Sequence, residues 1–179
     1  MASETTAAQT MIRQNPIGLP EADAQKMIEA LNKDLATMLV LYNQYHKHHW
    51  IAEGAEFLEL HLLLEEHYTE LHMQYDQVAE RIVTLGGLPV SSPSEMEQHA
   101  YVEHEPSGLH DLRDMLGHDL DAERKLSSNM RKHIALAEEI GDYGTESLLK
   151  EILQATEKRA AFLEKHLLRE SLTRTMPIE

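Results

Sequence analysis

Apolar side chains recur every three or four positions along four long segments, and this spacing constrains the fold more than any other feature of the sequence. Between residues 20 and 54 the apolar stripe consists of Ile28, Leu31, Leu35, Met38, Tyr42 and Tyr45. The next segment carries Phe57, Leu60, Leu64, Tyr68, Leu71, Tyr75, Val78, Ile82 and Leu85. Steps of three and four residues place side chains on one face of an α-helix. Each segment is therefore predicted to be an amphipathic helix that packs against other helices.

Proline, glycine and capping residues set the expected helix limits. Pro20 suits a first helical position, and Gly54 is expected to end the first helix. A short helix should begin after Ser92, where Glu95 completes a capping box. In chain order, the expected helices are residues 20–54, 55–85, 92–100, 109–140 and a last one capped by Asp142 or Thr145.

Four long helices and one short helix predict an all-α fold. The connection 86–108 holds the short helix and is long enough to cross a bundle. A four-helix bundle with one such crossover, here between helices two and three, is the ferritin-like arrangement. We expect residues 1–19 to form a flexible N-terminal tail, residues 20–174 the bundle, and residues 175–179 a C-terminal tail.

Composition narrows the possible functions. The chain of 179 residues has no cysteine, which excludes disulfides, thiolate metal sites and cysteine nucleophiles. A net charge of −15 and 12 histidines favour metal cations as partners over nucleic acid. The first 19 residues lack an apolar run, and no segment has the length and apolarity of a membrane span. We therefore expect a cytoplasmic protein with no membrane partner.

A polar stripe runs beside the apolar face of the second helix. It consists of His61, Glu65, His72, Asp76 and Glu80, at successive spacings of 4, 7, 4 and 4 residues. These spacings place the five side chains on one helix face. Each of the first four follows a core residue by one position, so the stripe is rotated by about 100° from the core. We expect it at the flank of the bundle.

The length of this stripe points to a site shared by two chains. His61 and Asp76 are 15 residues apart, which corresponds to roughly 22 Å along a helix, too far for one ion to bind both. If two copies of the helix pack antiparallel about a two-fold axis, position 61 faces position 80 and position 65 faces position 76. Isologous dimers produce such reciprocal pairing. A His–Glu cluster would then meet an Asp–Glu cluster twice in each dimer.

The end of the first helix supplies further candidates. His49 continues the apolar stripe after Tyr45, and the short link 51–56 returns the chain beside His61. His49 and His61 are therefore expected to share an ion, with Trp50 placed to supply an electron. Imidazole and carboxylate ligands suit Fe(II), Mn(II) or Zn(II). The sequence contains no Glu-x-x-His, which argues against a di-iron site inside the bundle.

Several of these stretches resemble the Dps family of mini-ferritins, the DNA-binding proteins from starved cells. The resemblance covers residues 25–170, and its motifs are His48-His49-Trp50-Ile51-Ala52-Glu53-Gly54, Phe57, Leu60-His61, Asp76-Gln77-Val78-Ala79-Glu80-Arg81 and Leu85-Gly86-Gly87-Leu88-Pro89. It implies a homo-dodecameric shell that oxidises Fe(II), usually with hydrogen peroxide and otherwise with dioxygen, and stores Fe(III) mineral as protection against oxidative stress.

The resemblance also implies a ligand set. It places His49 and His61 of one subunit with Asp76 and Glu80 of the two-fold mate, and Trp50 beside them. Many members have Asp where this chain has Glu65, which is one methylene longer and binds directly or through water. His46 and His72 are extra imidazoles, read either as solvated side chains or as ligands for a second metal such as zinc. The remaining histidines are assigned to the surface or to interfaces: His99, His104, His110, His118, His133 and His166.

Other readings remain open. One alternative is a nucleoid DNA-coating protein with secondary metal sites, and another is a helical assembly protein bridged by zinc. Charge argues against DNA binding, because residues 1–19 offer only Arg13, and the segment after Leu168 offers two arginines against two glutamates. An acidic group at the turn after the third long helix is either ordinary capping or the mouth of a three-fold pore; it consists of Glu138, Glu139, Asp142 and Glu146.

Overall fold

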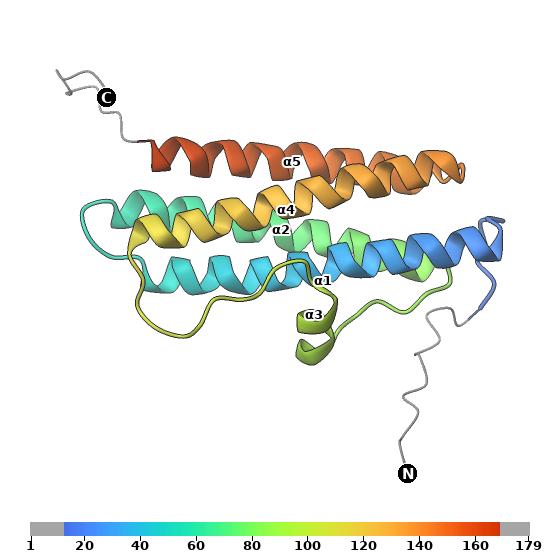
Figure 1. Ribbon diagram of the computed structural model, residues 1–179, viewed down its shortest axis with the longest axis horizontal. Coiled ribbons are helices and arrows are strands. Elements are labelled where there is room, and N and C mark those ends of the chain that lie inside the picture. Colours follow the sequence, from blue (N-terminus) through green and yellow to red (C-terminus); the bar gives the residue numbers. More distant parts are fainter. Residues whose placement is uncertain (1–12, 169–179) are drawn as a thin grey trace, which may run out of the picture.

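The computed structural model describes residues 13–168 and is built from helices joined by loops (Figure 1). In chain order the helices are α1 (Glu21–Ile51), α2 (Phe57–Thr84), α3 (Pro93–His99), α4 (Leu112–Glu139) and α5 (Tyr143–Leu167). The expected all-α fold with four long helices and one short one is confirmed. The expected end of the bundle at residue 174 lies outside the described residues, as do residues 1–12 of the N-terminal tail.

The four long helices form two antiparallel hairpins. α1 packs against α2, and α4 packs against α5. The connection from α2 to α4 carries α3 along α1 and returns to the end of the bundle where α2 begins, so that α2 and α4 run in the same direction (Figure 1). This crossover makes the bundle ferritin-like. Among residues 13–168, α2 contacts only α1 and α5, so part of its surface is covered by no other helix.

Local sequence signals set most of the helix ends. Ser92 accepts a hydrogen bond from the backbone N–H of Glu95, and the Glu95 carboxylate accepts from the backbone N–H of Ser92, which is the expected capping box. Of the two expected caps of α5, Asp142 is the one used, and it accepts from the backbone N–H of Thr145. Pro20 lies one position before α1 instead of inside it.

The start of α4 was predicted three residues too early. Leu109 was assigned to the buried face of this helix, yet it is 78% exposed and lies in the connection. Asp111 has an extended backbone, with φ −62° and ψ 140°, and precedes the first helical residue. The connection crosses α1 and is fixed there by buried contacts of Glu105, so the chain is not free to coil before Asp111.

Two glycines allow close packing at the end of α2. Gly86 has φ +88°, and a Cβ atom there would lie 2.3 Å from the carbonyl oxygen of Arg13. A Cβ atom on Gly87 would lie 2.7 Å from the side chain of Ile28. The Leu85-Gly86-Gly87 stretch therefore lets the chain leave α2 while remaining in contact with the start of α1.

The acidic turn between α4 and α5 is used for capping and pairing. Asp142 is buried, and its Oδ1 atom lies 2.5 Å from Nη2 of Arg81 in α2. Glu146 forms an ion pair with Lys150 one turn further along α5. Of the two interpretations of the acidic group, helix capping and a pore mouth, capping is the correct one for Asp142.

A buried ion network ties the bundle together. Arg159 of α5 is 1% exposed, and its Nε atom donates to Glu123 of α4 over 2.5 Å. The same guanidinium donates to Glu70 and Gln74 of α2, at 2.7 and 2.9 Å. The hydroxyl group of Tyr45 in α1 donates to Glu123 over 2.7 Å. All four long helices thus contribute to one network inside the apolar core.

Among residues 13–168, none of the helices combines the length and the apolarity that crossing a membrane would require.

Replacing Arg159 with Ala should destabilise the protein by about 3–5 kcal/mol, because it leaves the Glu123 carboxylate buried without its partner. The measurement is the free energy of unfolding in urea. The matched control is Arg124→Ala, which removes an exposed pair with Glu164 and should cost at most about 1 kcal/mol. Equal losses in the two variants would contradict the role given to the buried network.

His67 should make the protein less stable in acid. Burial, with Arg159 as the next cause, lowers the pKa of this histidine to about 3. At pH values between this value and the unfolded pKa of about 6.5, only the unfolded chain binds the proton. The free energy of unfolding therefore decreases by about 1.4 kcal/mol for each unit by which the pH is lowered. His67→Phe should therefore flatten the loss of urea stability between about pH 7 and about pH 5. His99→Ala, at an exposed position of α3, should leave it unchanged.

Candidate metal centre

His49 and His61 form a reciprocal pair where α1 ends and α2 begins. Nδ1 of His49 lies 2.8 Å from the carbonyl oxygen of His61, and Nδ1 of His61 lies 2.9 Å from the carbonyl oxygen of His49. The two rings stack with centroids 3.7 Å apart and planes inclined by 17°. The expectation that these histidines lie together agrees with this geometry.

These hydrogen bonds determine which tautomer each ring adopts when it is neutral. A carbonyl oxygen only accepts, so each Nδ1 carries the proton and donates it. The lone pair of each neutral imidazole is then on Nε2, which is the atom left to bind a metal ion. A hydrogen bond from the second ring nitrogen to a carbonyl is the usual way in which proteins orient a ligating histidine. The two rings therefore have the orientation that a pair of metal ligands would need.

The expected carboxylate ligands lie along the same exposed flank of α2. Glu65 follows His61 by one helical turn, while Asp76 and Glu80 lie at the other end of the helix. All three side chains are exposed, in agreement with the expected position beside the core. Within residues 13–168 of one protomer, no three His, Asp or Glu side chains gather closely enough to hold an ion. One protomer thus brings together the two histidines but not Asp76 and Glu80.

Trp50 projects from the end of α1 next to this pair. Its side chain is 71% exposed, and its ring is parallel to that of His46, with centroids 5.4 Å apart. Burial lowers the pKa of His46, and the neighbouring His49 and His72 lower it further, so this imidazole is neutral at neutral pH. Its neighbours in one protomer are the aromatic rings of Tyr42, Trp50 and Tyr68.

Three tyrosines that sequence periodicity assigned to the core lie at its edge, where α1 packs against α2. They are Tyr42, Tyr68 and Tyr75, each half-buried. The ring of Tyr68 lies 3.9 Å from that of His46 and 5.3 Å from that of His49, measured between centroids. Burial raises the pKa of Tyr68, and the nearby Glu65 carboxylate raises it further. The flank therefore carries an aromatic cluster as well as a polar stripe.

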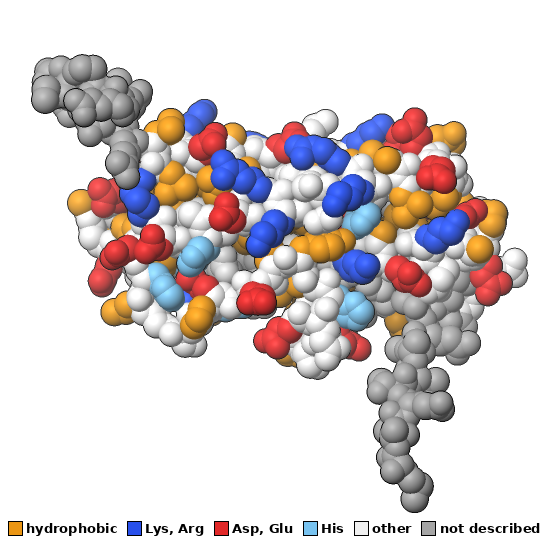
Figure 2. Space-filling model, viewed as in Figure 1, with side chains coloured by type: hydrophobic (Ala, Val, Ile, Leu, Met, Phe, Trp, Pro, Cys, Tyr) orange, Lys and Arg blue, Asp and Glu red, His pale blue; other side chains and the backbone are white. Residues whose placement is uncertain are grey.

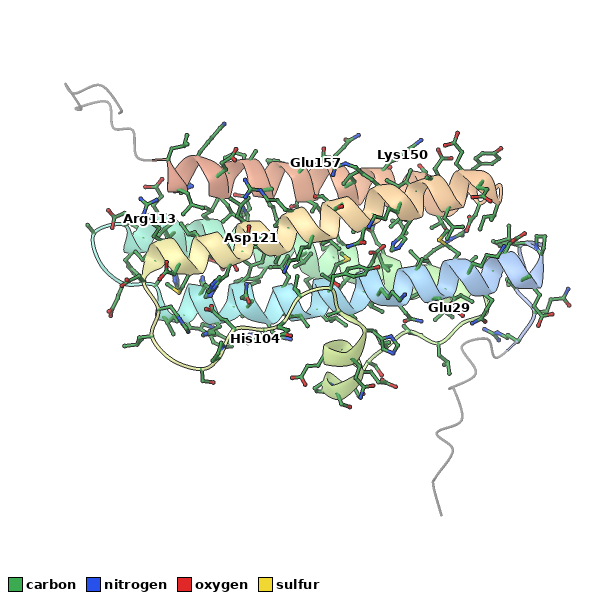
Figure 3. All side chains as sticks on the ribbon, viewed as in Figure 1. Glu29, His104, Arg113, Asp121, Lys150 and Glu157 are labelled. Atoms are coloured by element: carbon green, nitrogen blue, oxygen red, sulfur yellow. The ribbon has the colours of Figure 1, made fainter. Side chains whose placement is uncertain are left out.

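A second polar cluster lies on the opposite side of α1 and was missed by sequence reasoning. His48 is fully buried, with Nδ1 2.8 Å from Asp119 of α4 and Nε2 in contact with Glu105 of the crossover. His118 also reaches Glu105, over 3.1 Å. Burial would raise the pKa of Glu105, but His48, His118 and Lys47 reverse this and lower it. His104 marks the same part of the crossover in Figure 3.

Three of the histidines assigned to the surface or to interfaces have buried partners: His110 and His118 approach Glu105, and His133 approaches Asp34. Nδ1 of His133 lies 2.7 Å from the buried carboxylate of Asp34, and its side chain is 13% exposed. His118 is half exposed but is held by Glu105. The signal available for His133 was the charged residue Asp34 at a core position of α1, and Asp119 at a core position of α4 was the corresponding signal for His48.

Comparison with known proteins defines the family. A family profile described as the ferritin-like domain matches residues 28–172. A nutrient stress-induced DNA-binding protein from Nostoc is 37% identical over 97% of this chain and 95% of its own length. A DNA protection during starvation protein from Halobacterium salinarum is 40% identical over 80% of this chain and 79% of its own length.

Solved structures agree with this assignment. DpsC from Streptomyces coelicolor superposes with a TM-score of 0.89 at 34% identity, over 92% of this chain and 96% of that one. A Dps protein from Vibrio cholerae, described as a member of a broad superfamily of ferritin-like diiron-carboxylate proteins, gives 0.82 at 34% identity, over 88% and 98%. The fold and the profile thus define a ferritin-like protein. Within that superfamily, the chain belongs to the Dps family.

Proposed function

We propose that this protein oxidises Fe(II) at sites shared by two subunits and stores the Fe(III) product inside a twelve-subunit shell. The observation that carries the proposal is the reciprocal hydrogen bonding of His49 and His61, which leaves both Nε2 atoms free for a metal ion. Membership of the Dps family supports the iron chemistry and the assembly. Hydrogen peroxide is the proposed oxidant, with dioxygen as the slower alternative.

The ligand set combines both halves of the polar stripe. His49 and His61 bind the iron from one subunit, and Asp76 and Glu80 of the two-fold mate complete the site, with Glu65 close by. Two imidazoles and two carboxylates suit Fe(II), and also Mn(II) or Zn(II) at the same position. Carboxylates stabilise the Fe(III) product more than the Fe(II) substrate, because charge attraction grows with the charge of the ion. The site therefore favours oxidation.

Exposed apolar side chains on α2 support the antiparallel register. Leu58, Leu62, Met73 and Val83 are 64, 54, 58 and 43% exposed, which is unusual for such residues along one helix face. In the register that places position 61 opposite position 80, Leu58 faces Val83, and Leu62 faces Ala79. Met73 faces Tyr68 in the same register. One alignment of two α2 helices thus buries the apolar residues and unites the ligands, as an isologous interface requires.

Complementation between two inactive variants tests the shared site. His61→Ala and Asp76→Ala should each abolish fast Fe(II) oxidation, followed by stopped-flow absorbance after addition of hydrogen peroxide. Shells reassembled from equal amounts of both variants should regain about a quarter of the wild-type rate, because half of the dimers are mixed and each mixed dimer holds one intact site of two.

Controls separate this result from loss of assembly. Both variants and the mixture should elute with the wild-type shell in size-exclusion chromatography. His99→Ala, at an exposed position outside the site, should oxidise iron normally. Mixed shells as inactive as their parents would contradict a site shared between subunits. If wild-type shells oxidise Fe(II) no faster than buffer does, the ferroxidase proposal is wrong. The zinc-bridged assembly protein would then be the remaining alternative.

DNA coating is a second candidate function, because the names of both relatives mention DNA. Charge argues against DNA coating here, because the chain has 16 basic against 31 acidic residues. On the face formed by α4 and α5, the basic side chains are dispersed among acidic and apolar ones (Figure 2). Protection of DNA is therefore proposed to act through removal of Fe(II) and peroxide and not through binding.

Protection without binding is testable in one reaction. Plasmid DNA mixed with Fe(II) and hydrogen peroxide should be nicked less when wild-type shells are present, and His61→Ala shells should give no such protection. The same shells should leave the plasmid unretarded in a gel at low salt, where phosphate contacts are strongest. Retardation by wild-type protein would establish the DNA-coating alternative.

A further inference from the structure

We infer that the centre of the bundle is a metal-binding pocket that the guanidinium group of Arg159 occupies, so that this side chain keeps divalent ions out of the core. The inference goes beyond the proposed function, because every group in the pocket belongs to one chain and none is a proposed interface ligand. The ordinary alternative is a purely structural ion pair, whose removal would leave a cavity that fills with water.

Oxygen atoms from three helices surround this buried cation. Nε and Nη2 of Arg159 lie 2.5 and 3.3 Å from the two carboxylate oxygens of Glu123 in α4. Nη1 lies 2.7 Å from Glu70 and 2.9 Å from the amide oxygen of Gln74, both in α2. The hydroxyl group of Thr156, one turn earlier in α5, accepts from Nη2 over 3.1 Å. Four-helix bundles build metal sites from side chains that converge on the core in this way.

His67 of α2 adds a nitrogen atom that has no partner. The residue is 4% exposed, and within the described part of the chain its Nδ1 atom forms no hydrogen bond. Its lowered pKa leaves the ring neutral at physiological pH, which is the form that binds metals. With Glu70 and Arg159 it lines a cavity of about 20 Å³, which has room for about one water molecule. A buried nitrogen without a partner is costly, and a metal ion in the pocket would satisfy it.

The charges of the pocket are those of a cation site. Glu123 is fully buried, and burial raises the pKa of its carboxyl group, which Arg159 opposes. The carboxylates of Glu70 and Glu123 bind different edges of the guanidinium, and within residues 13–168 no three acidic or imidazole groups meet at one point. The Glu70 side chain is 33% exposed and long, so it can move inward once the guanidinium is gone. A divalent ion would then neutralise both carboxylates.

Arginine suits the role of an internal cation that no metal ion replaces. Its guanidinium group keeps its proton at any pH at which the protein is folded, so it never becomes a vacancy by titration. Arg159 is only 1% exposed, and the bonds to Glu123 hold it in place. Under the proposed function, Fe(II) would therefore bind between subunits and not inside the bundle.

Equilibrium dialysis against Co(II) tests the inference in assembled, full-length protein. Arg159→Ala should bind one more Co(II) ion per chain than wild type does, because the ion replaces the missing guanidinium. The visible absorption of the bound Co(II) should increase accordingly. Saturating Co(II) should also raise the urea midpoint of Arg159→Ala by more than that of wild type, since an ion that binds only the folded chain stabilises it.

Matched variants locate the additional ion. Arg159→Lys, which restores a cation at the same position, should bind no more Co(II) than wild type. Arg124→Ala, which removes an exposed arginine of α4, should also bind as wild type does. Adding Glu123→Gln to Arg159→Ala should remove the additional ion, and adding His67→Phe should weaken its binding.

Each outcome decides between the pocket and the structural ion pair. Arg159→Ala protein that is folded and binds no more Co(II) than wild type would overturn the inference. So would an additional ion that persists when Glu123→Gln is added, because it would then be bound elsewhere. If Arg159→Ala is unfolded without metal, recovery of helical circular dichroism on addition of Co(II) would support the pocket, and no recovery would overturn it. None of these results depends on whether the protein oxidises Fe(II).

Discussion

The link between α1 and α2 is the constraint on which the candidate site depends. Two hydrogen bonds between His49 and His61 join the last turn of α1 to the second turn of α2, and each imidazole donates to the other residue's backbone carbonyl. The same contacts hold the hairpin closed, set both tautomers and leave both Nε2 atoms unused. Packing and ligand geometry are therefore decided by one local arrangement, so that substitution of either histidine alters both.

The core adds rigidity at a distance from this site. The Arg159–Glu123 pair is shared by α4 and α5 and reaches α2 through Glu70. Burial raises the pKa of Glu123, and only the contacts with Arg159 and Tyr45 offset this effect. A network of this kind is costly to form and still more costly to break. The network fixes the orientation of the helices relative to one another. A site shared by two subunits requires this, because its side chains must be placed accurately.

Periodicity alone predicted most of the fold and half of the site. The helices, the crossover and the exposed flank of α2 follow from spacings of three and four residues, and the meeting of His49 with His61 followed from a short link. What could not be predicted depends on distant contacts. Glu105 reaches His48 across 57 residues, and nothing near Leu109 indicates that the crossover delays the start of α4. Local patterns carry no information on which loop will cover which helix.

The tyrosines illustrate a different limit of sequence reasoning. Tyr42 and Tyr75 fit an apolar stripe as well as leucine would, so their spacing indicated core packing. Only their partial exposure in the structure shows that they lie beside the polar stripe. An amphipathic side chain at the edge of a helix face is compatible with both environments, and its hydroxyl group acquires a role only from its neighbours.

The distance between His61 and Asp76 along α2 also bears on how the protein is made. Under the proposed pairing, a newly synthesised chain folds with its imidazoles and its distal acids apart, and it holds no complete ligand set until it meets a second copy. Peroxide chemistry would then begin only after two subunits have associated. A lone polypeptide, or one present at too low a concentration to associate, would leave iron in solution untouched.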